Sequence, residues 1–198
     1  MNLHHYYWFF DSVISKDECQ RIIQTGDKSF KKARVQDKSE LKKTRNSKVC
    51  FLNSKKHGYA FDIVRKYSHL ANRNAGWNFH TDWIESLQLT RYTKNQFYDW
   101  HRDAADVPYS FDHPDPEFRG KLRKISMTLN LTDPFFYEGG DLEFNFQHKL
   151  KDKSQVCKVA KHQGSIIFFP SFLHHRVTPV TKGTRWSLVA WIIGKPWS

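Results

Sequence analysis

Cysteine is scarce in this chain, with only Cys19, Cys50 and Cys157 among 198 residues. An odd number of widely spaced cysteines argues against a disulfide framework and against the clustered cysteines of a structural zinc site. A small secreted domain stabilised by disulfides is therefore excluded. We expect a protein of a reducing intracellular compartment, with a cytoplasmic location.

Long apolar runs are also missing. No stretch approaches the roughly 20 residues that a membrane helix needs, so we expect no membrane association. The first ten residues, Met1 to Phe10, lack the basic head and the small-residue cleavage site of a signal peptide. We interpret this aromatic segment as the first strand of the fold.

Aromatic residues, by contrast, are abundant: sixteen Phe, eight Tyr and seven Trp. Each can bury a large area, which offsets a modest hydrophobic content of 39%. The length suits one domain with a sizeable core. We expect a single domain over residues 1–198, in which residues 1–80 form a helical support with a mobile basic stretch and residues 81–198 form a β core.

The formal charge of +12 is unevenly distributed. Between Asp27 and His57, eleven Lys or Arg residues face three acidic ones, a net charge of +8. Such a patch could attract nucleic acid or an acidic protein. It could equally be a solvated loop, and residues 31–48 lack the interleaved aromatic side chains of a platform that stacks single strands. Both interpretations stay open.

Two helices are expected in the first eighty residues. The segment 13–23 opens with a capping box made by Ser15 and Glu18, and Gly26 is a natural stop. A second helix is predicted over about 59–74, with apolar residues on one face. Residues 27–48 are polar, so we expect them to be mobile.

After residue 76 the pattern changes to short strands. Loose alternation over 83–92 precedes a turn and the strand that ends near His101. Strands then follow at about 124–132, 141–146, 155–160, 164–169, 174–180 and 185–193. Residues 104–120 contain three prolines and four acidic residues, so they form a loop and a candidate lid. The pattern predicts a mainly β fold with N-terminal helices, a double-stranded β-helix or jelly roll with helical support.

A split trio of possible metal ligands stands out. His101 and Asp103 have strand spacing, so both can face one metal ion, and His175 lies on a late strand that a rolled sheet can bring beside them. Two imidazoles and one carboxylate are the facial triad that binds non-haem Fe(II) and leaves open positions. His174 competes with His175, because adjacent strand residues face opposite sides. Arg185 follows His175 by ten residues, and its planar fork suits a carboxylate.

These motifs resemble the Fe(II)- and 2-oxoglutarate-dependent dioxygenases, in the prolyl 4-hydroxylase-like branch that includes the PKHD-type hydroxylases. The stretch from Lys124 to Pro134, and the Gly139–Gly140 turn after it, also look like the family's middle strand and turn. The resemblance implies that His101, Asp103 and His175 bind iron and that Arg185 anchors 2-oxoglutarate. It favours His175 over His174, through the family pattern His-x-Val-x-Pro-Val.

Further expectations follow from the resemblance. Tyr92 stands where the family often has a tyrosine that helps to bind 2-oxoglutarate. Some relatives carry a second tyrosine on the next strand, whereas residues 125–131 contain none, so Ser126 or Thr128 would have to substitute. The implied cofactors are Fe(II), 2-oxoglutarate and O₂, with ascorbate as an optional addition.

The implied activity is hydroxylation of an unactivated C–H bond, with release of succinate and CO₂. A prolyl residue of a peptide or protein is the expected substrate. Oxidation of a nucleobase in nucleic acid is the alternative enzyme activity, favoured by the basic charge. A non-catalytic binding module of the same fold is the third possibility, which the complete ligand set disfavours. The sequence gives no indication of the oligomeric state.

Overall fold

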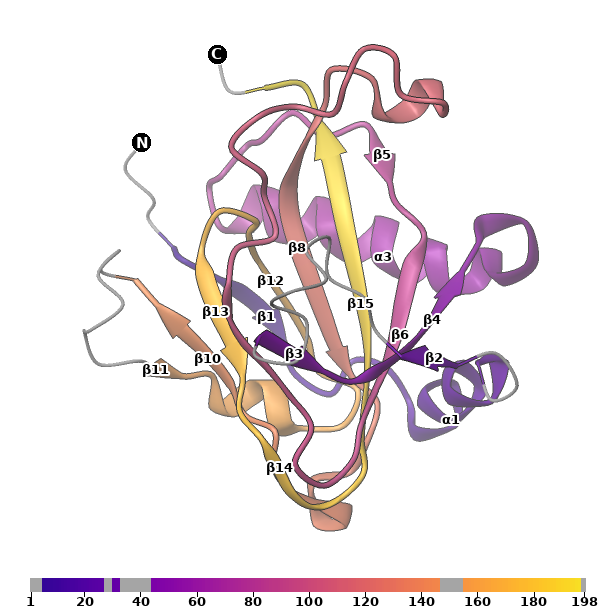
Figure 1. The fold of residues 1–198 in the computed structure, drawn as a ribbon, viewed down its shortest axis with the longest axis vertical. Helices are drawn as coiled ribbons and strands as arrows, with labels where there is room; N and C mark the ends of the chain where they lie inside the picture. The colour runs from indigo at the N-terminus through magenta and orange to yellow at the C-terminus, as the bar shows by residue number, and fades with distance from the viewer. Residues whose placement is uncertain (1–4, 27–29, 33–43, 147–154, 197–198) are drawn as a thin grey trace.

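The structure, a computed structural model, describes residues 5–26, 30–32, 44–146 and 155–196. Two helices and a series of short strands make up most of these residues (Figure 1). The helices are α1 (Lys16–Thr25) and α3 (Ser54–Asn74). The first seven strands are β1 (Trp8–Phe10), β2 (Lys31–Lys32), β3 (Arg45–Asn46), β4 (Lys48–Leu52), β5 (Trp83–Ile84), β6 (Leu87–Tyr92) and β7 (Phe97–His101). The later strands are β8 (Leu122–Asn130), β9 (Tyr137–Gly139), β10 (Leu142–Asn145), β11 (Gln155–Val156), β12 (Ile166–Pro170), β13 (His174–Val177), β14 (Val180–Gly183) and β15 (Arg185–Gly194).

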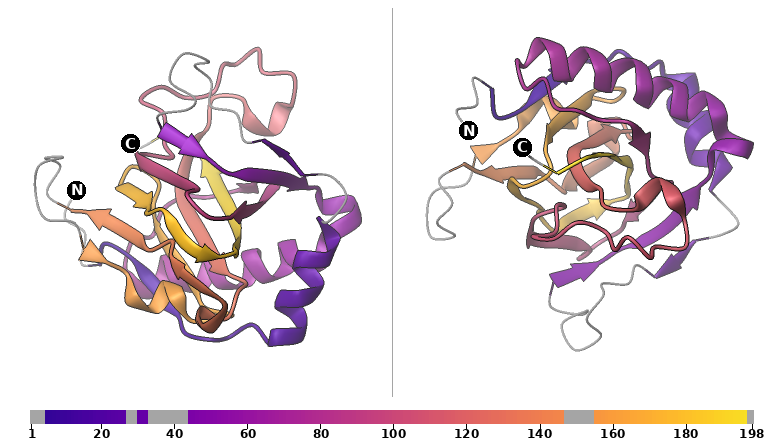
Figure 2. Two further views of the ribbon diagram at one scale, coloured as in Figure 1. Left: turned by 60° about the horizontal axis from the view of Figure 1, so that its bottom comes forward. Right: turned by 90° about the horizontal axis from the view of Figure 1, so that it is seen from above.

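The strands form two main antiparallel sheets that curl around a shared interior (Figures 1 and 2). The large sheet has the order β1-β12-β8-β15-β6-β4-β2, with β5 added beside β15, and the small sheet has the order β11-β10-β13-β7-β3. Strands β14 and β9 pair separately. The predicted mainly β jelly roll is confirmed, because strands distant in sequence, such as β8 and β15, are direct neighbours.

Both helices lie on the outer face of the large sheet, as the right-hand view of Figure 2 shows for α3. One hydrophobic cluster joins the helices to that face; it includes Phe61 and Val64 of α3 together with Met127 and Leu129 of β8. A second cluster lies between the two sheets. Strand β12 contributes to both clusters, since Phe168 faces the helices and the next residue faces the small sheet. The helices thus support the large sheet, and its other face is left for the interior.

The helix predictions are confirmed with small changes. Helix α1 begins after Ser15, whose side chain accepts from the backbone of Glu18 while the Glu18 carboxylate accepts in return, and it ends at Gly26. Helix α3 begins at Ser54, five residues before the predicted start, because Asn53 caps it and the chain bends at His57. Within the described residues, no helix is long and apolar enough to cross a membrane.

The strand predictions need correction at 155–160 and at 174–180. The strand expected at 155–160 is only Gln155–Val156, and a 3₁₀ turn follows at Lys158–Lys161. The strand expected at 174–180 is divided into β13 and β14, because Pro179 has no N–H to donate to a ladder. Strand β9 was not predicted. It is three residues long, too short to show a period.

The polar stretch 27–48 is partly ordered into strands, contrary to the simple loop that its composition suggests. Lys31–Lys32 pairs with β4, and Arg45–Asn46 pairs with β7 as the edge of the small sheet. Two residues are too few to show the alternation of apolar and polar side chains that identifies a strand in a sequence. These two strands are therefore recognised only by their pairing with β4 and β7 in the structure. The expected mobility of the remaining residues, 27–29 and 33–43, concerns positions outside the described part of the chain.

Candidate metal centre

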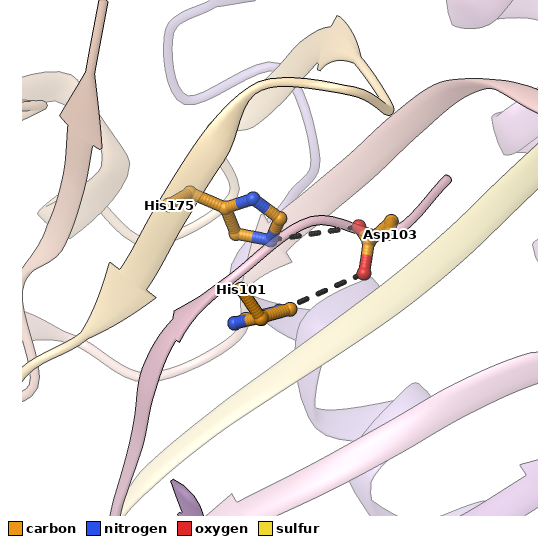
Figure 3. A group of neighbouring side chains, drawn as sticks. All are labelled: His101, Asp103 and His175. Atoms are coloured by element: carbon orange, nitrogen blue, oxygen red, sulfur yellow. Dashed lines mark ion pairs between the residues drawn. The ribbon is translucent and has the colours of Figure 1, made fainter. Parts of the chain in front are cut away.

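The three predicted ligands meet at one place on the inner face of the small sheet (Figure 3). His101 ends β7 and His175 lies in β13, and the two are direct cross-strand partners. Partners of this kind present their side chains on the same face of a sheet. Asp103 follows just after β7, where its backbone N–H donates to the Ser171 carbonyl at 2.9 Å. One ligand atom from each of the three residues lies within 4.8 Å of the others.

The two imidazoles are oriented by backbone carbonyls. Nδ1 of His101 lies 2.7 Å from the Asp99 carbonyl oxygen, and Nδ1 of His175 lies 2.9 Å from that of Leu173. A carbonyl can only accept, so Nδ1 carries a proton in both rings, and Nε2 is the ring nitrogen that faces the other ligands and can bind a metal. The Nε2 atoms lie 3.6 Å and 3.5 Å from the two oxygens of Asp103. Burial, together with the nearby His175, lowers the pKa of His101 to about 3, which keeps that ring neutral.

The Asp103 carboxylate completes the donor set as an anion. Burial alone would raise its pKa, but the neighbouring imidazoles and the guanidinium of Arg123 outweigh burial and lower the pKa to about 2. The hydroxyl of Ser126 donates to Asp103 Oδ2 at 2.7 Å, and the hydroxyl of Ser171 lies 2.9 Å from that of Ser126. The carboxylate is therefore ionised at neutral pH and held in position by a second layer of side chains.

A pocket extends from the trio along the inner face of β15. Arg185, the first residue of β15, lines it and is only 2% exposed. Its Nη1 atom is buried and has no hydrogen-bond partner in the described part of the chain. An unpaired buried guanidinium is costly unless an anion compensates it. This end of the pocket therefore fits a carboxylate ligand, as the sequence predicts for Arg185.

The side chains around Arg185 match the prediction for Tyr92 and extend it. Tyr92 is the cross-strand partner of Arg185, lines the same pocket, and has its ring centroid 5.7 Å from the Arg185 guanidinium carbon. Burial raises its pKa, so the phenol stays protonated and can donate a hydrogen bond. Gly140, in the predicted Gly-Gly turn, has φ +62°, and an added Cβ would lie 2.9 Å from Arg185 Cδ. A side chain here would push against the Arg185 stem.

The structure separates the competing candidates. His174 is half-buried, pairs with Asn145, and is not among the converging ligand atoms. Thr128 lines the pocket, whereas Ser126 contacts Asp103 and supports the trio. The two proposed substitutes for a second tyrosine thus occupy different places, and only Thr128 faces the pocket that contains Arg185.

Two residues of the site, Tyr98 and Arg45, were not identified from the sequence. The ring of Tyr98 stacks on the His101 imidazole, with centroids 3.5 Å apart, and the guanidinium carbon of Arg45 lies 4.4 Å from the Tyr98 centroid. Arg45 is 7% exposed, and none of the residues that the structure describes forms a hydrogen bond with its Nη2 atom. Tyr98 stands in the same short segment as His101, which could have indicated it. Arg45 lies in the polar stretch, where no local pattern separates it from the other basic residues.

A sequence profile described as the 2OG-Fe(II) oxygenase superfamily matches residues 87–193, more than half of the chain. A PKHD-type hydroxylase of Xylella fastidiosa (strain M23) is 36% identical over 107 residues, which cover 53% of this chain and 43% of that relative. A PKHD-type hydroxylase of Escherichia coli O1:K1 is 36% identical over 105 residues, with 52% and 41% covered. The chain thus spans less than half the length of these curated relatives.

Solved structures of prolyl hydroxylases have a similar fold. A viral collagen prolyl hydroxylase from Paramecium Bursaria Chlorella virus-1, solved as a 2OG complex, superposes with a TM-score of 0.68 at 23% identity, covering 96% of this chain and 97% of that one. A prolyl hydroxylase from Trichoplax adhaerens, in complex with a hypoxia inducible factor peptide fragment, gives 0.67 at 15% identity, covering 96% and 84%. At these identities the likeness establishes the fold.

Proposed function

The chain belongs to the 2OG-Fe(II) oxygenase superfamily, and from this premise we propose that it is an Fe(II)- and 2-oxoglutarate-dependent hydroxylase with His101, Asp103 and His175 as its metal ligands. The observation that carries the proposal is the convergence of two imidazoles and one carboxylate beside a buried arginine whose Nη1 atom has no hydrogen-bond partner among the described residues. Two nitrogens and one oxygen on one side of a metal ion suit ferrous iron with open positions on the other side.

Arg185 is the proposed anchor for the distal carboxylate of 2-oxoglutarate, and Tyr92 is a proposed donor to the same co-substrate. When bound, iron and 2-oxoglutarate would supply the activation of O₂, with succinate and CO₂ as products. The protein orients the three proposed metal ligands in advance. Hydrogen bonds from Nδ1 fix both imidazoles, and the hydroxyl of Ser126 fixes the carboxylate of Asp103. The buried guanidinium of Arg45, close to Tyr92 and Tyr98, adds positive charge that favours a dianionic ligand.

The pocket has two ends, which suggests where a substrate lies. Arg185 and Trp191 both line it from β15, and they lie six positions apart along the strand, a distance of roughly 20 Å. If the co-substrate occupies the Arg185 end, then the Trp191 end is left for the substrate, with the metal ligands between them. The Nε1–H of Trp191 is buried and has no acceptor among residues 5–26, 30–32, 44–146 and 155–196, so it can donate to a substrate carbonyl.

A prolyl residue of a peptide or protein is the substrate that we propose. Support comes from similar proteins, since two of the solved structures with this fold are prolyl hydroxylases and one of these was solved with a peptide fragment. Oxidation of a nucleobase remains the alternative, because the net charge of +12 would favour a nucleic-acid partner. We further propose that residues 1–198 act as one domain, in which 1–80 support the core formed by 81–198. The cytoplasmic location and the use of ascorbate stay predictions.

The decisive experiment measures succinate release by the purified, iron-loaded protein under air. We expect release to require 2-oxoglutarate and Fe(II), and to be stimulated by a proline-rich peptide more than by single-stranded DNA of equal concentration. Stimulation by DNA alone would replace the proposed substrate with the alternative. Failure to bind iron at all would leave the third possibility, a non-catalytic module of the same fold.

The hydroxyl of Ser126 gives a prediction about the metal site. Its bond to Asp103 Oδ2 is a support of the kind whose loss lowers metal affinity by about 10- to 100-fold. We therefore expect Ser126→Ala to weaken Fe(II) binding within that range, measured anaerobically by competition with a chelator. Ser68→Ala is the matched control, because the Ser68 hydroxyl donates to the Arg65 carbonyl within α3 and Ser68 does not line the pocket. Equal iron affinity in both variants would show that Asp103 needs no such support.

A further inference from the structure

Arg123 lies between the metal centre and the Trp191 end of the pocket. Its guanidinium carbon is 3.9 Å from the centroid of the Trp191 ring, a stacking distance. Its Nη1 atom donates a long hydrogen bond, 3.5 Å, to the backbone carbonyl of Asp103. One guanidinium thus contacts both an indole of the pocket wall and the segment that carries a proposed metal ligand. The position of Arg123 therefore affects the shape of this end of the pocket.

Glu85 fixes Arg123 in place. The Nε and Nη2 atoms of Arg123 donate to the two carboxylate oxygens of Glu85 at 2.8 Å and 2.7 Å, a bidentate pair. The Glu85 side chain is only 8% exposed, so water competes little for these bonds. Its backbone N–H also donates to the Trp191 carbonyl at 3.0 Å. Glu85 is thus joined to the pocket wall through both its side chain and its backbone.

A third residue reaches the same carboxylate from the loop that follows Asp103. The hydroxyl of Tyr109 donates to Glu85 Oε1 at 3.0 Å, the oxygen that also accepts from Arg123 Nε. The backbone of Tyr109 is fixed on both sides, since its N–H donates to the Lys121 carbonyl and its carbonyl accepts from Gly120. Its ring meets Phe118 edge-on, with centroids 5.2 Å apart. Tyr109 is therefore anchored firmly enough to hold Glu85.

We propose that Tyr109 is a positioning residue, through which the loop 104–120 sets the substrate-facing wall of the pocket. Its hydroxyl orients the Glu85 carboxylate, the carboxylate orients the Arg123 guanidinium, and the guanidinium orients the Trp191 indole. Loss of the Tyr109 hydroxyl leaves the buried Glu85 carboxylate with one hydrogen-bond donor fewer. The side chains of Glu85, Arg123 and Trp191 can then shift together. The Arg185 end lies far along β15 and should not respond. This inference rests on the proposed function, which assigns the Trp191 end to the substrate.

The test compares Tyr109→Phe with Tyr67→Phe, which removes a hydroxyl from α3 outside the pocket. In Tyr109→Phe we expect the apparent KM for a proline-rich peptide to rise about tenfold, as the loss of one hydrogen bond to a charged group predicts. The affinity for 2-oxoglutarate, titrated anaerobically through the iron charge-transfer band, should not change. Unchanged KM, or equal losses for peptide and 2-oxoglutarate, would overturn the proposal.

A second measurement does not depend on the identity of the substrate. Subtracting the fluorescence of Trp191→Phe from that of the parent isolates the Trp191 signal, in both the wild-type and the Tyr109→Phe background. We expect acrylamide to quench this signal more strongly when Tyr109 is replaced, because Arg123 no longer covers the ring in one position. Identical quenching would refute the positioning role. If the peptide fails to stimulate the wild type, the proposed substrate is wrong, and the quenching comparison still decides the role of Tyr109.

Discussion

Replacing His175 by alanine is expected to abolish iron-dependent turnover of 2-oxoglutarate, while His174→Ala keeps most of it. The Nε2 atom of His175 points toward Asp103 and is one of the three converging ligand atoms, whereas His174 is not among them. With two protein ligands left, Fe(II) binds weakly and loses its fixed open positions. We expect turnover in His175→Ala to fall by more than about a hundredfold, beyond the usual effect of losing a supporting residue.

The measurement is 2-oxoglutarate consumption together with bound iron per protein, determined for both variants after loading under argon. The same loss is expected for His101→Ala and for Asp103→Ala, since each removes one donor. Far-ultraviolet circular dichroism controls for folding. Full activity in His175→Ala, with loss in His174→Ala, would move the third ligand to the neighbouring residue and contradict the geometry described above.

A second large effect is expected at Arg185. Its buried fork can donate two parallel hydrogen bonds to a carboxylate, whereas a lysine offers a point charge on a stem with different reach. Hydrogen bonds to charged groups contribute about 1.5 to 3 kcal/mol each. Arg185→Lys should therefore weaken 2-oxoglutarate binding by about tenfold or more. Iron binding should be unaffected, because Arg185 is not among the ligand atoms.

Anaerobic titration of the co-substrate by the iron charge-transfer band tests this expectation. Arg176→Lys serves as the matched control, because Arg176 binds Glu143 on the small sheet and does not line the pocket. An unchanged affinity in Arg185→Lys would mean that the co-substrate carboxylate lies elsewhere, and the buried guanidinium of Arg45 would then be the first residue to examine.

The residues that local patterns identified are those whose role depends on near neighbours in the chain. Helix α1 could be predicted because its capping box joins Ser15 and Glu18, three residues apart. His101 and Asp103 could be paired because alternate residues of an extended chain face the same side. Arg185 became a candidate through its fixed distance from His175 along the chain, combined with a family likeness. Local patterns of this kind can be recognised in the sequence without knowledge of the rest of the fold.

The contacts that the sequence did not predict depend on strands from distant parts of the sequence, which pair only in the folded structure. Arg45 reaches Tyr98 only because β3 pairs with β7, and Tyr109 reaches Glu85 only because its loop folds back over the sheet. Ser126 and Thr128 were alternative candidates for contacting the co-substrate, yet Ser126 supports Asp103 and only Thr128 lines the pocket. These contacts arise from long-range pairing, in which each residue's neighbours are set by sheet order and curvature. Composition and spacing therefore indicate the metal ligands, whereas the side chains that orient them and shape the pocket are decided by the packing of the whole fold.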